Sequence, residues 1–307
     1  MSRKIWRDGT FVEWEAATVH VLSHSLQRGS LAFDYTSIHN TAKGTAIFRL
    51  GSHIDRLVTT CRITGLPLSY SRDELIEACV ETVRQNPGAM SLKISAIIPS
   101  LEVELVPQDP TVSVLIAAYD SKTDIIDKNR GEYHSASRLS LKIARDISNR
   151  REDIIPPQAK VAANYTSPMI EKWKARKEGF DDIILLDAYG NVAEAPTSNI
   201  FIVDENGNLA TPPAEKVLLG ITRSSIMELA PSMGITWREE DLTEGDLYTA
   251  NEVFLSASTV GVWPVVKIDG KTIGNGEMGT VSGRLKTRLQ EIKAGKDPEF
   301  EHWLHYV

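Results

Sequence analysis

A lysine held between two proline-defined boundaries constrains this chain more than any other feature. Pro156 and Pro157 end whatever element precedes them. Ser167 and Pro168 predict a helix start, with the serine as N-cap and the proline in the first helical position. Lys160 therefore lies on a short strand or loop among small apolar neighbours. Most lysines are solvated surface residues, but a partly desolvated lysine is the residue type that forms Schiff bases, because its amine is nucleophilic near neutral pH.

Charge and cysteine content exclude several functions. The 307 residues carry a formal net charge of −7, so no excess of positive charge favours nucleic acid or an anionic membrane. The N-terminal segment lacks the apolar stretch of a signal peptide, and apolar runs such as 112–118 are too short to span a bilayer. Cys61 and Cys79 are too few for a disulfide framework and lack metal-binding spacing. We therefore expect a cytoplasmic protein that binds no metal and is long enough for two domains.

Residues 1–120 predict a small α/β domain with antiparallel strands. Asp8 and Gly9 indicate a hairpin turn. In a following strand, two sets of side chains alternate over 33–39, and one of these faces is a candidate pocket wall. Ser71 and Glu74 have the spacing of a capping box at the start of a helix. Further strands are expected over 17–22, 46–50, 91–98 and 112–119.

The remainder predicts a linker and a larger α/β domain. Residues 121–133 are polar without a clear period, and we interpret them as the linker that precedes a domain over 134–307. The helix that begins at Pro168 is expected to end at Lys177, with Gly179 as the glycine that follows its C-cap. Other elements are expected over 137–147, 183–186 and 251–259, with a last helix that begins near Thr280.

One glycine in this second domain marks a candidate anion site. Gly220 permits close approach to its backbone, and Thr222 is predicted as the N-cap of the helix that follows. The N-terminus of a helix offers free N–H groups and a favourable dipole to an anion.

Several of these segments, in order along nearly the whole chain, resemble the fold-type IV pyridoxal-phosphate aminotransferases, and in particular the branched-chain amino acid aminotransferase family. AKVAANY at 159–165 matches the AK-x-x-x-NY segment of the family's cofactor lysine. VAEAPTSNIF at 192–201 matches V-x-E-x-x-x-x-N-x-F, and 220–223 matches GITR. NEVFLSAST at 251–259 is similar to E-V-F-x-S-G-T, and FRLGSHIDRL at 48–57 has the form of the segment that supplies a phosphate-binding arginine.

This resemblance implies a role for each matching residue. Lys160 would bind the aldehyde of pyridoxal 5′-phosphate, and Glu194 would meet the ring nitrogen, which must stay protonated to withdraw electrons. Tyr165 would donate to the phenolate O3′, and Asn199 is the asparagine that follows the glutamate in the motif. The implied phosphate contacts are Arg56, whose fork suits phosphate oxygens, the Gly220-Ile221 backbone, the Thr222 hydroxyl and Ser258.

The resemblance also implies a fold, an oligomeric state and an activity. We expect a two-domain α/β (α+β) fold, like that of D-amino acid aminotransferase, with the cofactor held between the domains, and a homodimer. The expected activity moves an amino group between a branched-chain or other aliphatic L-amino acid and a 2-oxo acid by ping-pong chemistry. Lys160, once released, would move the proton between Cα and C4′.

The candidate substrate contacts depart from the family pattern. The family shows H-x-L-x-Y-G and F-E-G-I-R where this chain has HSLQRG and FDYTS, so Arg28 replaces a tyrosine and Tyr35 a glycine. The family's Y-x-R becomes Ser91-Leu92-Lys93, so either Arg28 or Lys93 is the partner of the substrate carboxylate. Ala257 and Thr259 are further candidates.

These departures leave alternatives open. The run FDYTSIHNT to FRLGSHIDRL is also similar to (R)-selective amine transaminases, and D-amino acid aminotransferases share the scaffold. An aminodeoxychorismate lyase or a non-catalytic homologue that binds the cofactor are more remote alternatives.

Overall fold

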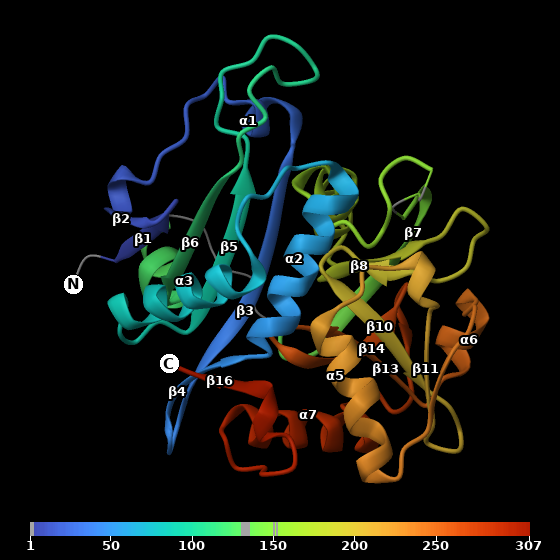
Figure 1. The fold of residues 1–307 in the computed structure, drawn as a ribbon. Helices are drawn as coiled ribbons and strands as arrows, with labels where there is room; N and C mark the ends of the chain where they lie inside the picture. Colours follow the sequence, from blue (N-terminus) through green and yellow to red (C-terminus); the bar gives the residue numbers. More distant parts are fainter. Residues whose placement is uncertain (1–2, 130–135, 150, 152) are drawn as a thin grey trace. The chain divides into compact units, whose positions relative to one another are not determined.

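The computed structural model describes residues 3–129, 136–149, 151 and 153–307, which form two compact units. Unit 1 contains the described residues of 3–129 together with 159–163 and 292–307, and unit 2 contains those of 136–158 and 164–291. The units are therefore not continuous in sequence, and Lys160 belongs to unit 1 although it lies within the range predicted for the C-terminal domain. Each unit has one β-sheet with helices (Figure 1).

Unit 1 is built on an antiparallel seven-stranded sheet in the order β16-β4-β3-β5-β6-β1-β2. Its strands are β1 (Lys4–Arg7), β2 (Thr10–Glu13), β3 (Leu31–Thr41), β4 (Gly44–Phe48), β5 (Ser91–Ile97), β6 (Ser113–Tyr119) and β16 (Leu304–Tyr306). Its helices are α1 (His24–Arg28), α2 (Leu50–Thr64) and α3 (Arg72–Gln85). Helices α2 and α3 pack on one face of the sheet, where the main core of this unit lies (Figure 1).

Local sequence signals explain several of these elements. Asp8 and Gly9 both have positive φ, at 47° and 91°, as the two-residue turn between β1 and β2 requires. The predicted capping box at the start of α3 is confirmed, because Ser71 Oγ accepts from the Glu74 N–H and the Glu74 carboxylate accepts from the Ser71 N–H. In β3 the even residues of 32–38 are buried, whereas Phe33 and Tyr35 on the opposite face are half-exposed.

Two predicted elements differ in the structure. Residues 17–22 do not form a strand, because a 3-10 turn at Trp14–Ala16 leads into irregular, mostly exposed chain without a partner strand. Described residues of the predicted linker form a π-helical turn at Ser121–Ile125 and a 3-10 turn at Ile126–Lys128, while 130–133 lie outside the described residues.

Unit 2 is built on a mixed nine-stranded sheet. The main order is β12-β11-β10-β13-β14-β7-β8, with β15 on β14 and β9 on β10; the pairs β11–β12, β14–β7 and β7–β8 are parallel. Its strands are β7 (Leu139–Ser148), β8 (Asp182–Leu186), β9 (Glu194–Ala195), β10 (Ser198–Val203), β11 (Leu209–Thr211), β12 (Trp237–Glu239), β13 (Glu252–Ala257), β14 (Gly261–Ile268) and β15 (Lys271–Thr272). Its helices are α4 (Thr166–Lys177), α5 (Ile221–Leu229), α6 (Glu244–Thr249) and the greater part of α7 (Thr280–Lys293).

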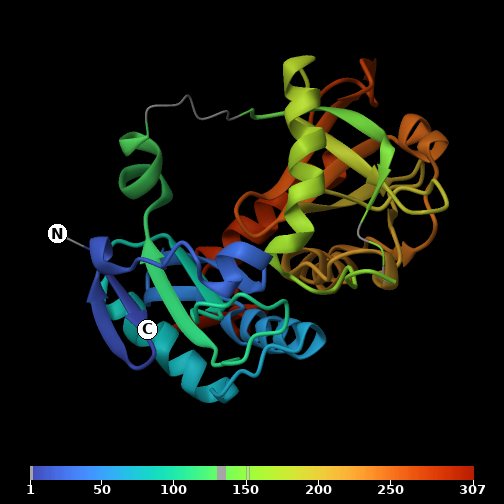
Figure 2. The ribbon, with the colours of Figure 1, turned by 90° about the horizontal axis from the view of Figure 1, so that it is seen from above.

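Helix α4 begins earlier than predicted. A 3-10 turn at Ala162–Tyr165 continues directly into the helix, so Tyr165 is the N-cap and Pro168 is the third helical residue. Proline is tolerated there because the first turn has no intrahelical acceptors for its N–H groups. The helix packs against β7 and β8 (Figure 2) and ends at Lys177, and Gly179 has the positive φ of 91° predicted for it.

The described residues contain neither a membrane-spanning helix nor a cluster of metal ligands. No helix in them is both long and apolar enough to cross a membrane. Nor do their histidine, cysteine, aspartate and glutamate side chains form a group able to hold a metal ion.

Candidate active site

The backbone of Lys160 is held within unit 1 by hydrogen bonds to two elements, β3 and α2. Its carbonyl accepts from the Phe33 N–H at 3.1 Å, and its own N–H donates to Thr60 Oγ1 on α2 at 3.1 Å. The next residue, Val161, forms an antiparallel bridge with Ala32. The lysine segment therefore occupies the edge of β3 that β4 leaves unpaired, and Lys160 is half-buried.

Two ammonium groups lie near one aromatic ring. Lys160 Nζ is 4.8 Å from the centroid of the Phe33 ring, and Lys93 Nζ is 5.2 Å from the same centroid. The two nitrogens are therefore no more than about 10 Å apart, the sum of those distances. Lys93 on β5 is in register with Tyr35 on β3, whose hydroxyl is 2.9 Å from Ser91 Oγ.

The structure separates the two candidate carboxylate partners. Tyr35 and Lys93 share the half-open face of the sheet with Phe33 and Lys160. Arg28 is exposed at the end of α1, where its guanidinium makes long hydrogen bonds to the carbonyls of Gln27 and Val103.

Arg56 is held by a buried carboxylate. Its Nε and Nη2 donate to the two oxygens of Asp34, each at 2.8 Å, and the Asp34 side chain is fully buried. His53 Nδ1 lies 2.6 Å from Asp34 Oδ1. Burial alone would raise the pKa of Asp34, but Arg56 and His53 hold that pKa well below its usual range. Burial lowers the pKa of His53 against the opposing effect of Asp34, so the imidazole is neutral and its Nδ1–H donates to the carboxylate.

Glu194 in unit 2 is a buried carboxylate, only 2% exposed. Its Oε2 accepts from Asn199 Nδ2 at 3.1 Å and from the Leu218 N–H at 3.3 Å. Asn149 Nδ2 lies 3.5 Å from Oε1. The structure thus brings together Glu194 and Asn199, two residues of the same motif. Asn149 was not predicted, since nothing in its local sequence distinguishes it.

Strand register aligns three polar side chains of unit 2. Glu194 on β9 is opposite Asn199 on β10, which is opposite Ser256 on β13. Residues directly opposite each other in a ladder project from the same face of a sheet. Glu194, Asn199 and Ser256 therefore form a polar row across three neighbouring strands, and all three are buried.

The loop before α5 packs tightly on this row. A Cβ atom at Gly220 would lie 2.0 Å from Asn199 Oδ1, so only glycine fits, although its φ of −66° is open to any residue. Gly220, not Thr222, is the N-cap of α5, because its carbonyl already accepts from the Ser224 N–H. Thr222 is the second residue of the helix, with a buried hydroxyl that has no hydrogen-bond partner in the described structure.

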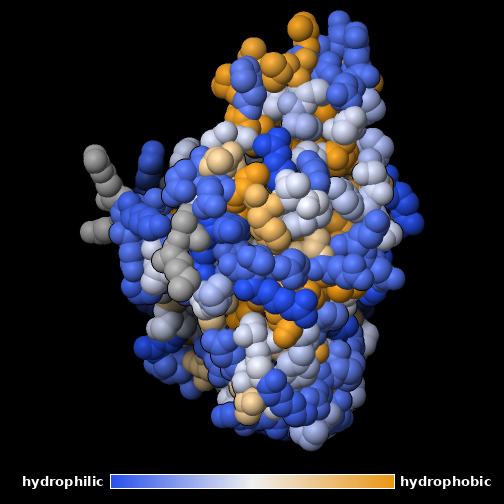
Figure 3. All heavy atoms as spheres, turned by 60° about the vertical axis from the view of Figure 1, so that its left-hand side comes forward, coloured by the Kyte–Doolittle hydropathy of each residue, from blue (hydrophilic) through white to orange (hydrophobic). Residues whose placement is uncertain are grey.

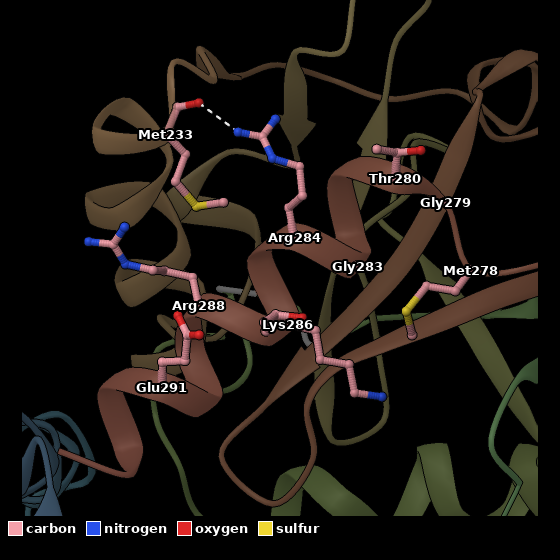
Figure 4. A pocket seen from close by; sticks show the side chains of 10 residues that line it. Met233, Met278, Gly279, Thr280, Gly283, Arg284, Lys286, Arg288 and Glu291 are labelled. Atoms are coloured by element: carbon pink, nitrogen blue, oxygen red, sulfur yellow. Dashed lines mark hydrogen bonds between the residues drawn. The ribbon is translucent and has the colours of Figure 1, made fainter. Parts of the chain in front are cut away.

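The remaining predicted cofactor and substrate contacts of unit 2 lie at the end of β13 and at the start of α4. Ala257 is the last residue of β13, and Ser258 and Thr259 form the turn that follows it. Tyr165 ends the 3-10 turn before α4. A hollow of about 610 Å³ along α7 contains none of the predicted residues; Arg284 and Met233 at its rim are joined by a hydrogen bond from Arg284 Nη2 to the Met233 carbonyl (Figure 4).

Comparison with known proteins identifies the family. The profile of the family described as Amino-transferase class IV matches residues 33–268. The branched-chain-amino-acid aminotransferase of Salmonella typhimurium is 34% identical, over 99% of this chain and 97% of that protein. The enzyme of the same name from Pseudomonas aeruginosa is 33% identical, over 97% of this chain and 95% of that protein.

Solved structures give the same result. The branched-chain amino acid aminotransferase of Escherichia coli has a TM-score of 0.90 at 30% identity, and the match covers 100% of this chain and 99% of that one. The Thermobaculum terrenum enzyme, solved in its PLP-form, has a TM-score of 0.87 at 25% identity, over 99% of this chain and 98% of that one.

These matches assign the chain to a family. It belongs to the class IV aminotransferases, which confirms the predicted family, enzyme class and fold type IV. The relatives and structures named here are all branched-chain aminotransferases, which does not favour the amine transaminase, D-amino acid or lyase alternatives.

Proposed function

We propose that this enzyme is a branched-chain amino acid aminotransferase that uses pyridoxal 5′-phosphate and moves an amino group between an aliphatic L-amino acid and a 2-oxo acid. The observation that carries the proposal is Lys160, which is half-buried and fixed by backbone hydrogen bonds on two sides. A lysine in such a place serves as a nucleophile and a proton carrier, because its amine is partly removed from water.

Residues of both units fit the cofactor. Glu194 offers a buried carboxylate to the pyridinium nitrogen, and Asn199 holds one of its oxygens. The first turn of α5 offers N–H groups to the phosphate, together with the buried Thr222 hydroxyl that has no partner among the described residues. In unit 1, the Asp34 carboxylate orients the Arg56 guanidinium through Nε and Nη2, and a guanidinium fork suits phosphate oxygens. We assign Arg56, the Gly220-Ile221 backbone and Ser258 to the same phosphate, and Tyr165 to O3′.

The chemistry divides between the cofactor and the chain. Bound pyridoxal phosphate supplies the electron sink for carbanion character at the substrate Cα. Lys160 Nζ removes the proton from Cα and later returns one, which requires the amine to lie within hydrogen-bond reach of that carbon's proton. Glu194, whose carboxylate accepts from Asn199 and the Leu218 N–H, would hold a proton at the ring nitrogen.

Lys93 is our candidate for the substrate carboxylate. Its ammonium is within about 10 Å of Lys160 Nζ on the same face of the sheet, whereas Arg28 is directed to loop carbonyls at the surface. Tyr35, Ala257 and Thr259 complete the candidate substrate contacts.

An exposed apolar surface supports a homodimer. Two segments of unit 1 lie side by side, joined by a bridge between Ser23 and Leu101 and by the His24 N–H to the Ser100 carbonyl. Their exposed apolar residues are Val19, Val21, Leu22, Leu26, Leu101, Val103, Leu105 and Val106. Apolar side chains gather at the upper end of the molecule in Figure 3. Because monomers rarely expose such a patch, we propose that a second copy covers it. Both cysteines are free thiols, which supports a reducing compartment such as the cytoplasm.

A spectroscopic experiment tests the function. The purified chain is saturated with pyridoxal phosphate, and its visible absorption is recorded before and after addition of L-leucine, D-alanine or (R)-1-phenylethylamine in separate samples. We expect the band of the bound cofactor to be lost with L-leucine alone and to return with a 2-oxo acid. Loss with D-alanine or the amine would identify the alternative activity instead, and no bound-cofactor band in the wild type would exclude an aminotransferase.

A further inference from the structure

We infer that Ser256, to which the motif match assigns no role, is a phosphate ligand of the cofactor through its side-chain hydroxyl. The inference rests on the proposed use of pyridoxal phosphate and adds a binding residue on β13 to the contacts made by α5.

The first observation is a buried hydroxyl without a partner. Ser256 is 2% exposed, and its Oγ has no hydrogen-bond partner among the described residues. Buried hydroxyls in folded proteins are nearly always paired, because an unpaired one loses its hydration without compensation. Two other buried serines of unit 2 follow this rule: Ser225 Oγ donates to the Ile221 carbonyl at 2.8 Å and Ser282 Oγ to the Gly279 carbonyl at 3.3 Å. The Ser256 hydroxyl can therefore donate a hydrogen bond to a bound ligand.

The second observation is the position of this hydroxyl. Ser256 ends the polar row that begins with Glu194, two strand spacings or about 10 Å away between backbones. Pyridoxal phosphate carries its phosphate on a methylene arm at C5, so that the phosphate extends away from the ring nitrogen. If Glu194 meets the nitrogen at one end of the row, the phosphate would lie further along the row, toward Ser256.

The third observation is that the anion-binding end of α5 adjoins the same row. Helix α5 packs against β13, and Gly220 at its N-terminus contacts Asn199 in the middle of the row. Thr222 in the first turn carries the other hydroxyl in this region that is buried without a partner in the described structure. Two unpaired hydroxyls and the N–H groups of one helix end are a donor set for a phosphate, since phosphate oxygens only accept hydrogen bonds.

Replacement of Ser256 by alanine tests the assignment through two effects of opposite sign. The cofactor-free Ser256→Ala protein should melt roughly 2 to 4 °C higher than the wild type, because an unpaired buried hydroxyl is removed. Its affinity for pyridoxal phosphate should fall on the order of tenfold to a hundredfold, the loss of one hydrogen bond to a charged group. Its affinity for pyridoxal, which has no phosphate, should stay unchanged, and the 31P resonance of the bound cofactor should shift.

A matched control is Thr211→Val on β11 of the same sheet, which removes a buried hydroxyl that does have a partner, the Ile200 carbonyl at 2.8 Å. We expect this variant to melt lower than the wild type and to bind pyridoxal phosphate normally. Ser256→Ala that melts higher but binds the cofactor like the wild type would overturn the assignment. A lower melting temperature, or equal losses for pyridoxal and its phosphate, would overturn it as well. A wild-type protein without affinity for pyridoxal phosphate would refute the proposed function itself.

Discussion

Asp34 and Arg56 form a two-point ion pair inside unit 1, in which Nε–Oδ2 and Nη2–Oδ1 are both 2.8 Å. The Tyr35 N–H and His53 Nδ1 also donate to Asp34 Oδ1. The carboxylate thus fixes the orientation of the guanidinium that we assign to the cofactor phosphate, and it balances the charge of that group.

Asp34→Asn should therefore destabilise the protein strongly. Loss of one partner from a buried pair costs about 3 to 5 kcal/mol, and the affinity for pyridoxal phosphate should fall with it, since Arg56 loses its orientation. Urea unfolding of the cofactor-free protein measures the first effect. The control is Asp55→Asn, because Asp55 pairs with Arg72 at the exposed surface, where about 1 kcal/mol or less is expected. Equal effects of the two variants would contradict the account.

The pH dependence of this pair has a defined sign. The pKa of Asp34 is lowered from 3.8 in the folded state, so its stabilising contribution is present above that value and is lost as the pH falls through the folded-state pKa. The stability difference between the wild type and Asp34→Asn should stay constant from pH 7 to about 4. A difference that shrinks already near pH 6 would show that the carboxylate is not held in this way.

Gly220→Ala should disrupt the site by steric contact alone. The added methyl group would displace the Asn199 amide, which binds Glu194, so we expect a loss of about 1 to 3 kcal/mol of stability and a weaker affinity for the cofactor. Thermal unfolding and cofactor titration measure the two effects. Gly283→Ala in α7 is the matched control, because its Cβ would meet Met278 only at an ordinary 3.7 Å. That variant should be neutral or more stable, as alanine favours a helix.

Lys293 should make stability increase at alkaline pH. It is 8% exposed, with its ammonium 4.9 Å from the Phe48 ring centroid, and burial lowers its pKa from 10.5 to about 8. A basic group with a lowered pKa destabilises the fold while it is protonated, so stability should rise between pH 8 and 10.5, by up to roughly 3 kcal/mol. His39, whose pKa burial and Lys293 lower to about 4, stays neutral in this range.

Replacement of this lysine isolates its contribution. Lys293→Met should be more stable than the wild type at pH 7 and should show no rise between pH 8 and 10.5, in chemical unfolding followed across that range. A variant that is less stable at pH 7 would mean that the charged amine stabilises the fold.

The two candidate carboxylate partners can be separated by kinetics. Lys93→Met should raise KM for both the amino acid and the 2-oxo acid by about tenfold, the value of one charged contact, with little change in kcat because binding alone is affected. Arg28→Met should leave KM near the wild-type value, since Arg28 is exposed on α1. The reverse pattern would assign the carboxylate to Arg28.

Signals that act over a few residues were readable from the sequence. The hairpin at Asp8-Gly9, the capping box of α3 and the glycine after α4 depend on neighbouring residues only, and all three are present. The tight approach at Gly220 also matches its motif. The prediction of Thr222 as the N-cap of α5 was wrong. Gly220 is the N-cap, because its carbonyl is the first to accept a hydrogen bond from an N–H group of the helix.

Contacts between distant segments were not readable. Asp34 and Arg56 are 22 residues apart and meet only because α2 packs under β3. Asn149 reaches Glu194 through the pairing of strands far apart in the chain. The edge position of Lys160 follows from β4 pairing only with the end of β3, a register that no local pattern encodes.

The most direct measurement locates the covalent bond between chain and cofactor. The wild-type protein with pyridoxal phosphate is reduced with borohydride, digested and analysed by mass spectrometry. We expect the added mass of the cofactor on the peptide that contains Lys160 and on no other, with none on Lys93, the other lysine near the Phe33 ring. Lys160→Ala should show no such peptide. A cofactor attached to Lys93 or elsewhere, or an unmodified Lys160 in the saturated wild type, would contradict the central claim.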